Sequence, residues 1–343
     1  MNARPIEHVV SSNATARLGG HAVVLALAVG LAPIPARHLP ELVDRADVVV
    51  VGTVTAIVDQ GRSVVEMPGR QVPARRAVAE VAIEHVLKGL AESPRIAVRF
   101  AVPDAPIGYG EVPLSQRRIL FLKQTDDAYE LVSPYYPTVI AGLSARPNGA
   151  SPLERVISVV GGVLRDRLAT TQHKREAIAV LWGLRHAASI AMLRAALQDV
   201  DRGVRLAAAA AGLLAAGDIS ALPIAEHELT RRRSAEPEII HNLRVAIAEG
   251  VDDEAAIPAL IRLLSTDVAT RRAAVSALRR TKSPAAAPGL GRGLDDIDIE
   301  IRYLAVVGLA EILDEPAWRP NMDAFRSKEI AYLTYWRTRV AGR

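Results

Sequence analysis

A short pattern of residues returns at a fixed phase in the second half of the chain, and this repetition constrains the fold more than any other feature. In residues 197–217 an aspartate is followed four positions later by an arginine, and then by small residues three positions apart. The recurring positions are Asp201, Arg205, Ala208 and Ala211; Asp267, Arg271, Ala274 and Ala277; and Asp298, Arg302, Ala305 and Gly308. One such unit cannot bury its own apolar face, so the repetition predicts a stack of helical units.

The spacing of the marks predicts how many units there are. The 66 residues between Asp201 and Asp267 leave room for a further unit at Glu236, and an earlier unit begins at Thr171. Successive marks are then 30, 35, 31 and 31 residues apart, a spacing typical of units built from two helices. We therefore expect five helical pairs.

Each recurring residue type has a physical role in such a unit. An aspartate before a helix can accept hydrogen bonds from first-turn amides and favours the positive end of the helix dipole, which predicts helix starts at Asp201, Asp267 and Asp298. Small residues three apart share one helix face and allow close packing. The arginines recur once per unit, and we interpret them as a ladder paired with neighbouring aspartates. The alternative is an anion-binding stripe.

The units resemble the HEAT-like repeats of the phycobilisome-lyase type. LQDVDRGVRLAAAAAGL (197–213) and LDDIDIEIRYLAVVGLAEI (294–312) match that pattern closely, LSTDVATRRAAVSAL (264–278) matches it in part, and the units near 171 and 236 match only in their apolar positions. The resemblance covers about half the chain. It implies an all-α solenoid with an extended surface, whereas glycosylase or lyase activity would follow from fold analogy alone.

Before the repeats, the apolar pattern has the period of β-strands. The expected strands are residues 46–58, 75–87, 96–100, 117–123 and 129–132. Gly52 and Gly61 are taken as the boundaries of the first strand. No segment of crossover length separates them, so we expect a small closed antiparallel β-barrel.

The order of these strands and the VLKG turn at 86–89 resemble the OB-fold barrel of the netrin-like, tissue-metalloprotease-inhibitor type found in exported bacterial proteins. The family's inhibitors ligate a protease's zinc through an N-terminal cysteine. This chain contains no cysteine, so inhibition by that route does not carry over.

The first residues are typical of an export signal. Arg17 precedes an apolar run at 22–31 that is too short to span a bilayer, and small residues follow it up to Ala36, near which we expect cleavage. This predicts a periplasmic or secreted protein without membrane insertion after cleavage. The alternatives are a true start further along the chain or an ordinary buried helix at 22–31.

These patterns together predict a multidomain protein, in which a small antiparallel OB-like β-barrel precedes an all-α HEAT-like solenoid. The expected parts are a signal peptide (1–36), the barrel (39–143), a linker (144–152) rich in Pro, Gly, Asn and Ser, the solenoid (153–313) and a C-terminal capping helix (314–343). Within the last part we expect one helix over 321–340. A chain of 343 residues that is 50% hydrophobic has ample material for packed cores.

The composition and motifs give little indication of a catalytic, metal or nucleic-acid site. The net charge is only +4 and aromatic residues make up 4%, which argues against nucleic-acid binding. His227 lies between two glutamates, with His241 further on, but we interpret both histidines as part of a solvated helix face. The acidic run 295–300 lacks the glycine and glutamate of a calcium loop, so we interpret it as a capped turn between helices. We expect no catalytic residues, no cofactor and no metal.

We therefore predict a non-enzymatic, extracytoplasmic scaffold whose repeats bind another protein and not a nucleic acid. The sequence favours no particular oligomeric state. One alternative is a cytosolic lyase-like or enzyme-accessory module. Another is a protease inhibitor that acts through the barrel, for which Arg37–Pro40 is the candidate segment.

Overall fold

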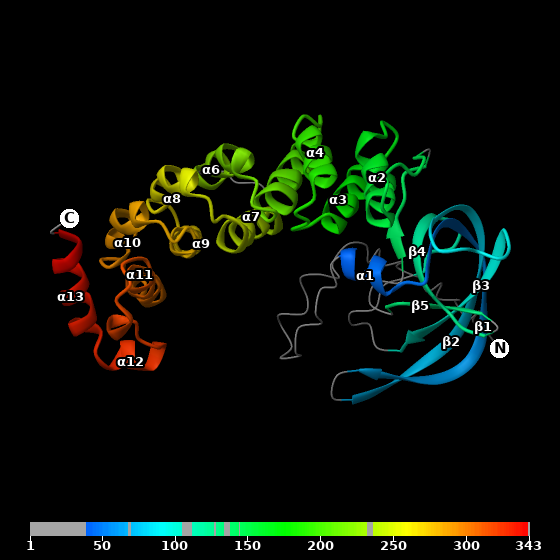
Figure 1. The fold of residues 1–343 in the computed structure, drawn as a ribbon, viewed down its shortest axis with the longest axis horizontal. Coiled ribbons are helices and arrows are strands. Elements are labelled where there is room, and N and C mark those ends of the chain that lie inside the picture. Colours follow the sequence, from blue (N-terminus) through cyan, green and yellow to red (C-terminus); the bar gives the residue numbers. More distant parts are fainter. Residues whose placement is uncertain are drawn as a thin grey trace, which may run out of the picture.

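The computed structural model shows an elongated molecule in which a β-sheet lies at one end and a row of paired helices extends away from it (Figure 1). It describes residues 39–67, 70–104, 112–126, 128–133, 138–143, 145–231 and 236–341. The predicted signal peptide, residues 1–36, lies outside the described residues. At this level the expectation of a β-rich part followed by a helical part is confirmed.

The first part consists of a short helix and a sheet. The elements are α1 (Leu39–Arg45), β1 (Val48–Met67), β2 (Arg70–Lys88), β3 (Arg95–Pro103), β4 (Arg117–Gln124), β5 (Tyr129–Leu131) and β6 (Thr138–Ile140). The strand order is β1-β2-β3-β5-β4-β6, and β1 also pairs with β4. Five strands therefore close into a ring, and β6 is attached to β4 outside it.

One pairing differs from the expected antiparallel arrangement. β3 and β5 run parallel, with Val98 opposite Tyr129 and Arg99 opposite Glu130. All other pairs are antiparallel. A closed ring with an odd number of strands cannot alternate in direction throughout, so one neighbouring pair has to be parallel.

Strands β1 and β2 form a hairpin that is longer than the apolar pattern predicts. β1 continues past Gly61 to Met67 and β2 begins at Arg70, so the hairpin projects beyond the ring (Figure 1). The register shifts at four places along β1, and one of them is at Gly61, whose φ of 94° suits glycine. Such bulges bend and twist a strand without ending it, which is why Gly61 does not mark a strand boundary.

The run of four valines in β1 is buried on both faces of the sheet. Val48 and Val50 belong to the core that the ring encloses, together with residues of β2, β3 and β4. Val49 and Val51 point the other way and belong to a second core that continues through α1 into the helices. A strand covered on both faces explains a continuous apolar run where a half-exposed strand would alternate.

Hydrogen bonds from arginine side chains connect the sheet to the first helices. Arg117 of β4 donates to the carbonyl oxygens of Gly142 and Ala145, the latter at 3.3 Å. Arg155 of the first solenoid helix donates to the carbonyl oxygen of Leu87 at 2.8 Å. The backbone N–H of Gly142 also donates to the carbonyl oxygen of Val159 in that helix at 3.2 Å, so the segment before the helices is bonded to both parts. The two parts also share one hydrophobic core.

The helical region is a succession of paired helices. Its elements are α2 (Pro152–Arg165), α3 (Thr171–Val180), α4 (Ala187–Ala196), α5 (Arg202–Ala207), η2 (Ala208–Leu214), η3 (Ile219–Ala221), α6 (Leu222–Thr230), α7 (Pro237–Gly250), η4 (Glu254–Ala256), α8 (Ile257–Leu263), α9 (Val268–Arg280), η5 (Pro284–Ala286), α10 (Ala287–Gly293), α11 (Ile299–Ile312), η6 (Pro316–Trp318), α12 (Met322–Ser327) and α13 (Glu329–Ala341). Up to α11 these form five pairs within the described residues, in agreement with the predicted number.

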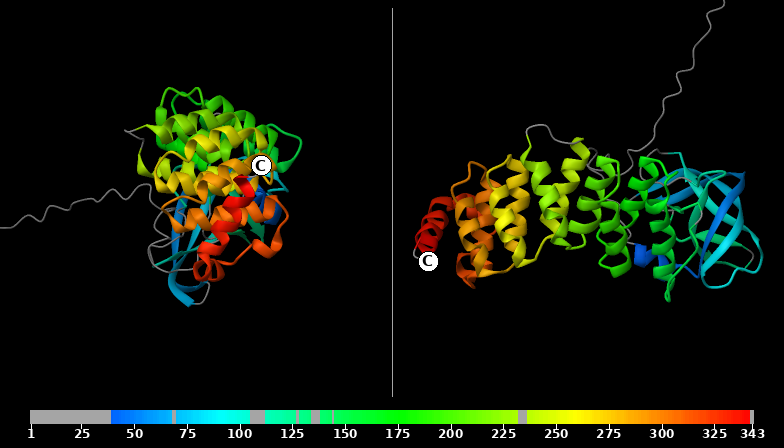
Figure 2. Two further views of the ribbon diagram at one scale, coloured as in Figure 1. Left: turned by 90° about the vertical axis from the view of Figure 1, so that its left-hand side faces the viewer. Right: turned by 90° about the horizontal axis from the view of Figure 1, so that it is seen from above.

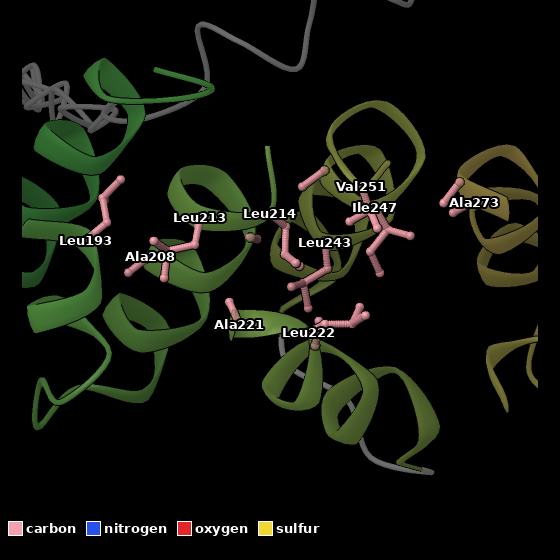
Figure 3. Packing of buried hydrophobic residues seen from close by; sticks show 14 of the residues in the cluster. Leu193, Ala208, Leu213, Leu214, Ala221, Leu222, Leu243, Ile247, Val251 and Ala273 are labelled. Carbon is pink, nitrogen blue, oxygen red and sulfur yellow. The ribbon is translucent and has the colours of Figure 1, made fainter. Parts of the chain in front are cut away.

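Leucine, isoleucine and alanine side chains fill the space between neighbouring pairs. Figure 3 shows Leu214 of the second unit beside Leu243 of the third, and both side chains are fully buried. At Gly250 an added Cβ would lie 2.0 Å from the carbonyl oxygen of Leu214. Only glycine allows the helices to approach this closely.

The second helix of the second unit is not a regular α-helix. After Ala207 it continues as the π-helix η2, whereas the repeat pattern predicted an unbroken helix with Ala208 and Ala211 on one face. Ala208, Ala210 and Leu213 are fully buried. The five-residue step from Ala208 to Leu213 is the spacing of π-helical hydrogen bonds, so the wider turn brings Leu213 into the core.

The C-terminal part contains two helices in place of the single helix expected over 321–340. The chain leaves the helical conformation at Lys328, where φ is −133°, and α13 then lies across the end of the stack (Figure 1). This break lets Phe325 pack against Tyr303 of α11, with ring centroids 5.6 Å apart, and Trp318 stack on Tyr335 at 3.7 Å. Aromatic side chains thus close the end of the core.

Candidate interaction surface

The turns within the helical pairs follow one another along one edge of the stack. Figure 2 shows the repeat helices upright and side by side in its right-hand view, so that their connecting turns form two edges. We call the edge formed by the turns inside each pair the turn edge. It contains Leu168 in the first unit, Val200 in the second, Thr266 in the fourth and Ile297 in the fifth.

Large aliphatic side chains point into solvent on this edge. Val200 is 94% exposed and Ile297 is 90% exposed, and each immediately precedes the aspartate that caps the following helix. Leu168, in the corresponding turn of the first unit, is 85% exposed. These three side chains contribute nothing to the core, so the sheet and the helices do not require them to be aliphatic.

The recurring arginines hold the backbone of these turns. Arg205 donates through Nη1 to the carbonyl oxygens of Asp199 and Val200, at 2.7 and 2.9 Å. Arg302 makes the same two bonds to Asp296 and Ile297, at 2.8 and 2.9 Å. The two turns therefore have the same geometry although they are three units apart. Arg271 makes one such bond, to the carbonyl oxygen of Thr266 at 2.8 Å.

In the second and fifth units, an aspartate two positions before the cap connects the turn to the preceding unit. Asp199 accepts a hydrogen bond from the backbone N–H of Asp201 at 2.9 Å and an ion pair from Lys174 at 2.6 Å. Asp296 likewise accepts from the backbone N–H of Asp298 at 2.9 Å and from Arg271 at 2.6 Å. Each turn is thus fixed at both ends.

All three predicted cap residues lie at helix N-termini. Asp201 accepts from the backbone N–H of Val204, Asp267 from those of Ala269 and Thr270, and Asp298 from those of Glu300 and Ile301. The backbone bond from Val204 holds the pKa of Asp201 below its ordinary value. The guanidinium of Arg272 lowers the pKa of Asp298 in the same direction, through bonds of 3.1 and 2.5 Å.

The structure brings two of the three predicted arginines together with carboxylates further along the chain. Arg271 bonds Asp296 through two nitrogens, and Arg302 bonds Glu329 at 2.5 Å. Arg205 instead bonds only backbone carbonyl oxygens among the contacts of the described residues. The interpretation of the arginines as a ladder paired with aspartates therefore describes Arg271, whereas Arg302 pairs with a glutamate.

Several members of this network were not among the residues singled out in the sequence. They are Lys174, Asp199, Arg244 and Arg272. The sequence does contain a signal for Asp199, which forms a D-x-D pair with the cap residue Asp201, just as Asp296 of the acidic run does with Asp298. The basic residues had none, because their partners lie about 25 residues further along the chain.

The residues considered for metal binding have other partners. Glu226 pairs with Arg262, and Glu228 is buried against Arg202, with both of its oxygens 2.6 Å from Nη2. Within the described ranges no group of three histidine or acidic side chains could hold a metal ion. In the acidic run, Asp298 caps α11, which confirms the interpretation of a capped turn.

The segment considered for protease inhibition does not form an exposed strand in its described half. Leu39 and Pro40 open helix α1, and Leu39 is only 4% exposed because it packs into the core shared with the solenoid. Arg37 and His38 lie outside the described residues. In the described part of the chain, no helix is both long and apolar enough to cross a bilayer.

A family comparison identifies the class of repeat. Residues 227–310 match the family model described as HEAT repeats, a range that runs from the end of α6 through most of α11. No curated protein matches the chain. The helical region is thus similar to HEAT repeats over residues 227–310, and this similarity suggests a scaffold for protein interaction.

Proposed function

We propose that this protein is a non-enzymatic, extracytoplasmic scaffold that binds another protein along the turn edge. One observation carries the proposal. Val200 and Ile297 are almost fully exposed, occupy the same position in two units, and lie on turns whose carbonyl oxygens are held by Arg205 and Arg302. Exposed aliphatic side chains on a fixed backbone bind a partner with little loss of backbone entropy.

The charge network supports this function by making the edge rigid. The ion pairs of Asp199 and Asp296 connect consecutive units, so the spacing between exposed side chains is set by the stack and not by flexible loops. A partner that covers the edge would then restrict mainly the side chains of the turns, because their backbone is already fixed.

We also propose a structural type for the ring of strands and for the helical repeats. We propose that the ring of β1 to β5 is an OB-like barrel of the netrin-like type, a hypothesis that its strand order and the β1–β4 pairing support. The D-x-D motif with arginine four residues after the second aspartate, at Asp201 and Asp298, supports repeats of the phycobilisome-lyase type. The parts would span 39–143 and 153–313.

Export and the lack of catalysis are also proposals. The apolar run at 22–31 and the small residues up to Ala36 support a cleaved signal and a periplasmic or secreted location. The chain contains no nucleophile elbow, phosphate-binding loop or zinc-protease motif, which supports a binding role without a cofactor.

Affinity capture after mild crosslinking tests this function. The tagged native protein is compared with a Val200→Asp, Ile297→Asp double variant, and mass spectrometry identifies both the captured proteins and the N-terminus of the bait. We expect a stoichiometric partner whose yield falls at least about tenfold in the variant, equivalent to about 1.4 kcal/mol, and an N-terminus near Arg37.

A matched control lies on the opposite edge. Ala255 and Ala285 are exposed residues of the short helices η4 and η5, which connect one unit to the next. The Ala255→Asp, Ala285→Asp variant adds the same charge and should retain the partner. Turnover of a substrate by the purified protein, abolished by one polar substitution that leaves the fold intact, would contradict a non-enzymatic role.

A further inference from the structure

In the described part of the chain, two ion pairs connect the first helical unit with the third, across the second. Arg175 of α3 donates through Nη1 and Nη2 to the carboxylate of Glu236, which precedes α7, at 3.1 and 3.2 Å. Arg185, in the turn before α4, pairs with Asp252, in the turn after α7, at 3.4 Å. The remaining ion pairs between units in this part connect only neighbouring units.

The first of these pairs departs from the repeating ladder. Arg175 and Arg272 each lie five residues after the residue that caps their helix. Arg272 bonds Asp298, the cap of the next unit, at 3.1 and 2.5 Å. Arg175 instead bonds Glu236, two units further along. The corresponding residue of the second unit is the buried Leu206, so the second unit supplies no arginine from this position to the third.

A glycine of the second unit makes room for Arg175. An added Cβ at Gly203 would lie 2.0 Å from Nη2 of Arg175 and would occupy the place of its guanidinium group. Gly203 lies in the regular helix α5, where glycine is less favourable than alanine, so the helix itself does not require it. The four other units have larger residues two positions after the cap, namely Gln172, Glu238, Ala269 and Glu300.

The second pair also passes close to a glycine of the second unit. An added Cβ at Gly217 would lie 3.3 Å from Nη2 of Arg185, which is closer than most Cβ contacts. Gly217 has a φ of 82°, so the backbone favours glycine there as well. The second unit therefore has a residue without a side chain beside each of the two arginines.

Both pairs are open to solvent. The side chains of Arg175 and Glu236 are 29% and 61% exposed, and those of Arg185 and Asp252 are 57% and 41% exposed. Exposed ion pairs are weak and are screened by salt. The screening length falls from about 30 Å at about 0.01 M salt to about 3 Å at about 1 M salt. The strength of both pairs should therefore depend on the ionic strength.

We propose that Arg175 and Arg185 act as straps that hold the first and third units at a fixed separation, and that salt releases them. In an ordinary solenoid each unit contacts only its neighbours, so small changes of angle add up along the stack. With the straps closed, the first three units move as one body. Their release changes the spacing of the turns along the turn edge. The inference concerns the shape of the stack and stands whether or not that edge binds a partner.

Distances between two spin labels, measured by pulsed electron paramagnetic resonance on the full chain, test the straps. The chain contains no cysteine, so labels are attached at Leu168→Cys in the first unit and His241→Cys in the third, both exposed positions. The distance distribution should be narrow at about 0.01 M salt and at least about twofold broader at about 1 M salt. The control pair, His241→Cys with Ile297→Cys, spans the third to fifth units and should keep its width.

Variants of the strapped pair of labels locate the effect. Arg175→Gln with Arg185→Gln removes both charges and should broaden the distribution at low salt to its high-salt width. Gly203→Ala should give part of this broadening, because the methyl group displaces the guanidinium of Arg175 while alanine supports the helix. The matched control is Arg165→Gln with Arg167→Gln, which removes two exposed charges from the same unit and leaves both straps in place.

Exchange of the charges provides a rescue. Glu236→Arg alone should broaden the distribution at low salt, and adding Arg175→Glu should make it narrow again. Circular dichroism verifies that each variant is folded.

Three results would overturn the inference. One is a width that salt leaves unchanged, or changes equally in the control pair of labels. Another is a distribution that stays narrow at low salt in the variant without both arginines. The third is equal broadening by Arg165→Gln with Arg167→Gln, since a general loss of positive charge would then be the cause.

Discussion

Replacing Arg271 by alanine should destabilise the fold by about 3 kcal/mol. The guanidinium donates to Asp296 at 2.6 and 3.0 Å and to the carbonyl oxygen of Thr266 at 2.8 Å. The side chains of Arg271 and Asp296 are 19% and 11% exposed, so the variant leaves a mostly buried carboxylate without its counter-ion. Breaking a buried pair from one side costs about 3–5 kcal/mol.

We expect the lower end of that range because Asp296 keeps the backbone N–H of Asp298, 2.9 Å away. Urea unfolding followed by circular dichroism measures the change. With a slope of about 3 kcal/mol per molar urea for a chain of this size, the midpoint should fall by about 1 M.

A double-mutant cycle isolates the pair itself. Arg271→Ala, Asp296→Ala and the double variant should give a coupling energy of about 2 kcal/mol or more. Arg75→Ala is the control, because its ion pair with Asp59 at 3.6 Å has both side chains more than half exposed, and it should cost less than about 0.5 kcal/mol. A cost below about 1 kcal/mol for Arg271→Ala, or no coupling with Asp296, would refute the role of the ladder in joining the units.

Three other changes test other parts of the account. The bonds from Arg272 hold the pKa of Asp298 below the ordinary value of about 3.9, so their stabilisation is present above that pH and is lost as the pH falls through the lower folded-state pKa. The urea midpoint should therefore be lower at pH 3 than at pH 6, and Asp298→Asn should reduce the difference; an unchanged difference would count against the pairing. Phe325→Ala removes a fully buried ring and should cost about 3–5 kcal/mol, with faster hydrogen exchange confined to α11 and the helices after it, whereas uniform acceleration would contradict a local cap. Gly250→Ala places a methyl group against Leu214 and should cost about 1–3 kcal/mol in the same urea assay, so a neutral effect would show that the two units are not in close contact.

The local features of the repeats could be predicted from the sequence because they depend on neighbouring residues. Asp201 and Asp298 precede apolar helical patterns, and a carboxylate there bonds amides only two or three residues away. The parallel pairing of β3 with β5 could not be predicted in this way, since it follows from closure of the whole ring. The same holds for the valines of β1, because the core on their second face continues from α1 into helices more than 100 residues away.

The candidate surface was only partly visible in the sequence. An aliphatic residue between two aspartates, as at Val200 and Ile297, is a signal for a side chain exposed on a turn. Its rigidity depends on Lys174 and Arg271 of the preceding unit, and no local pattern connects those residues to the turn. The π-helix after Ala207 also has no local signal, because alanine fits either helix type without a side chain that would distinguish them.

Site-specific photocrosslinking tests the turn edge most directly, because the chain contains no cysteine and a single introduced cysteine can carry the label. Val200→Cys, Ile297→Cys and the control Ala285→Cys are each labelled with a benzophenone maleimide and irradiated in an extract of the native source. The account predicts that one protein crosslinks from positions 200 and 297 and that position 285 gives no such product. Equal crosslinking from position 285, or no product from either turn, would contradict it.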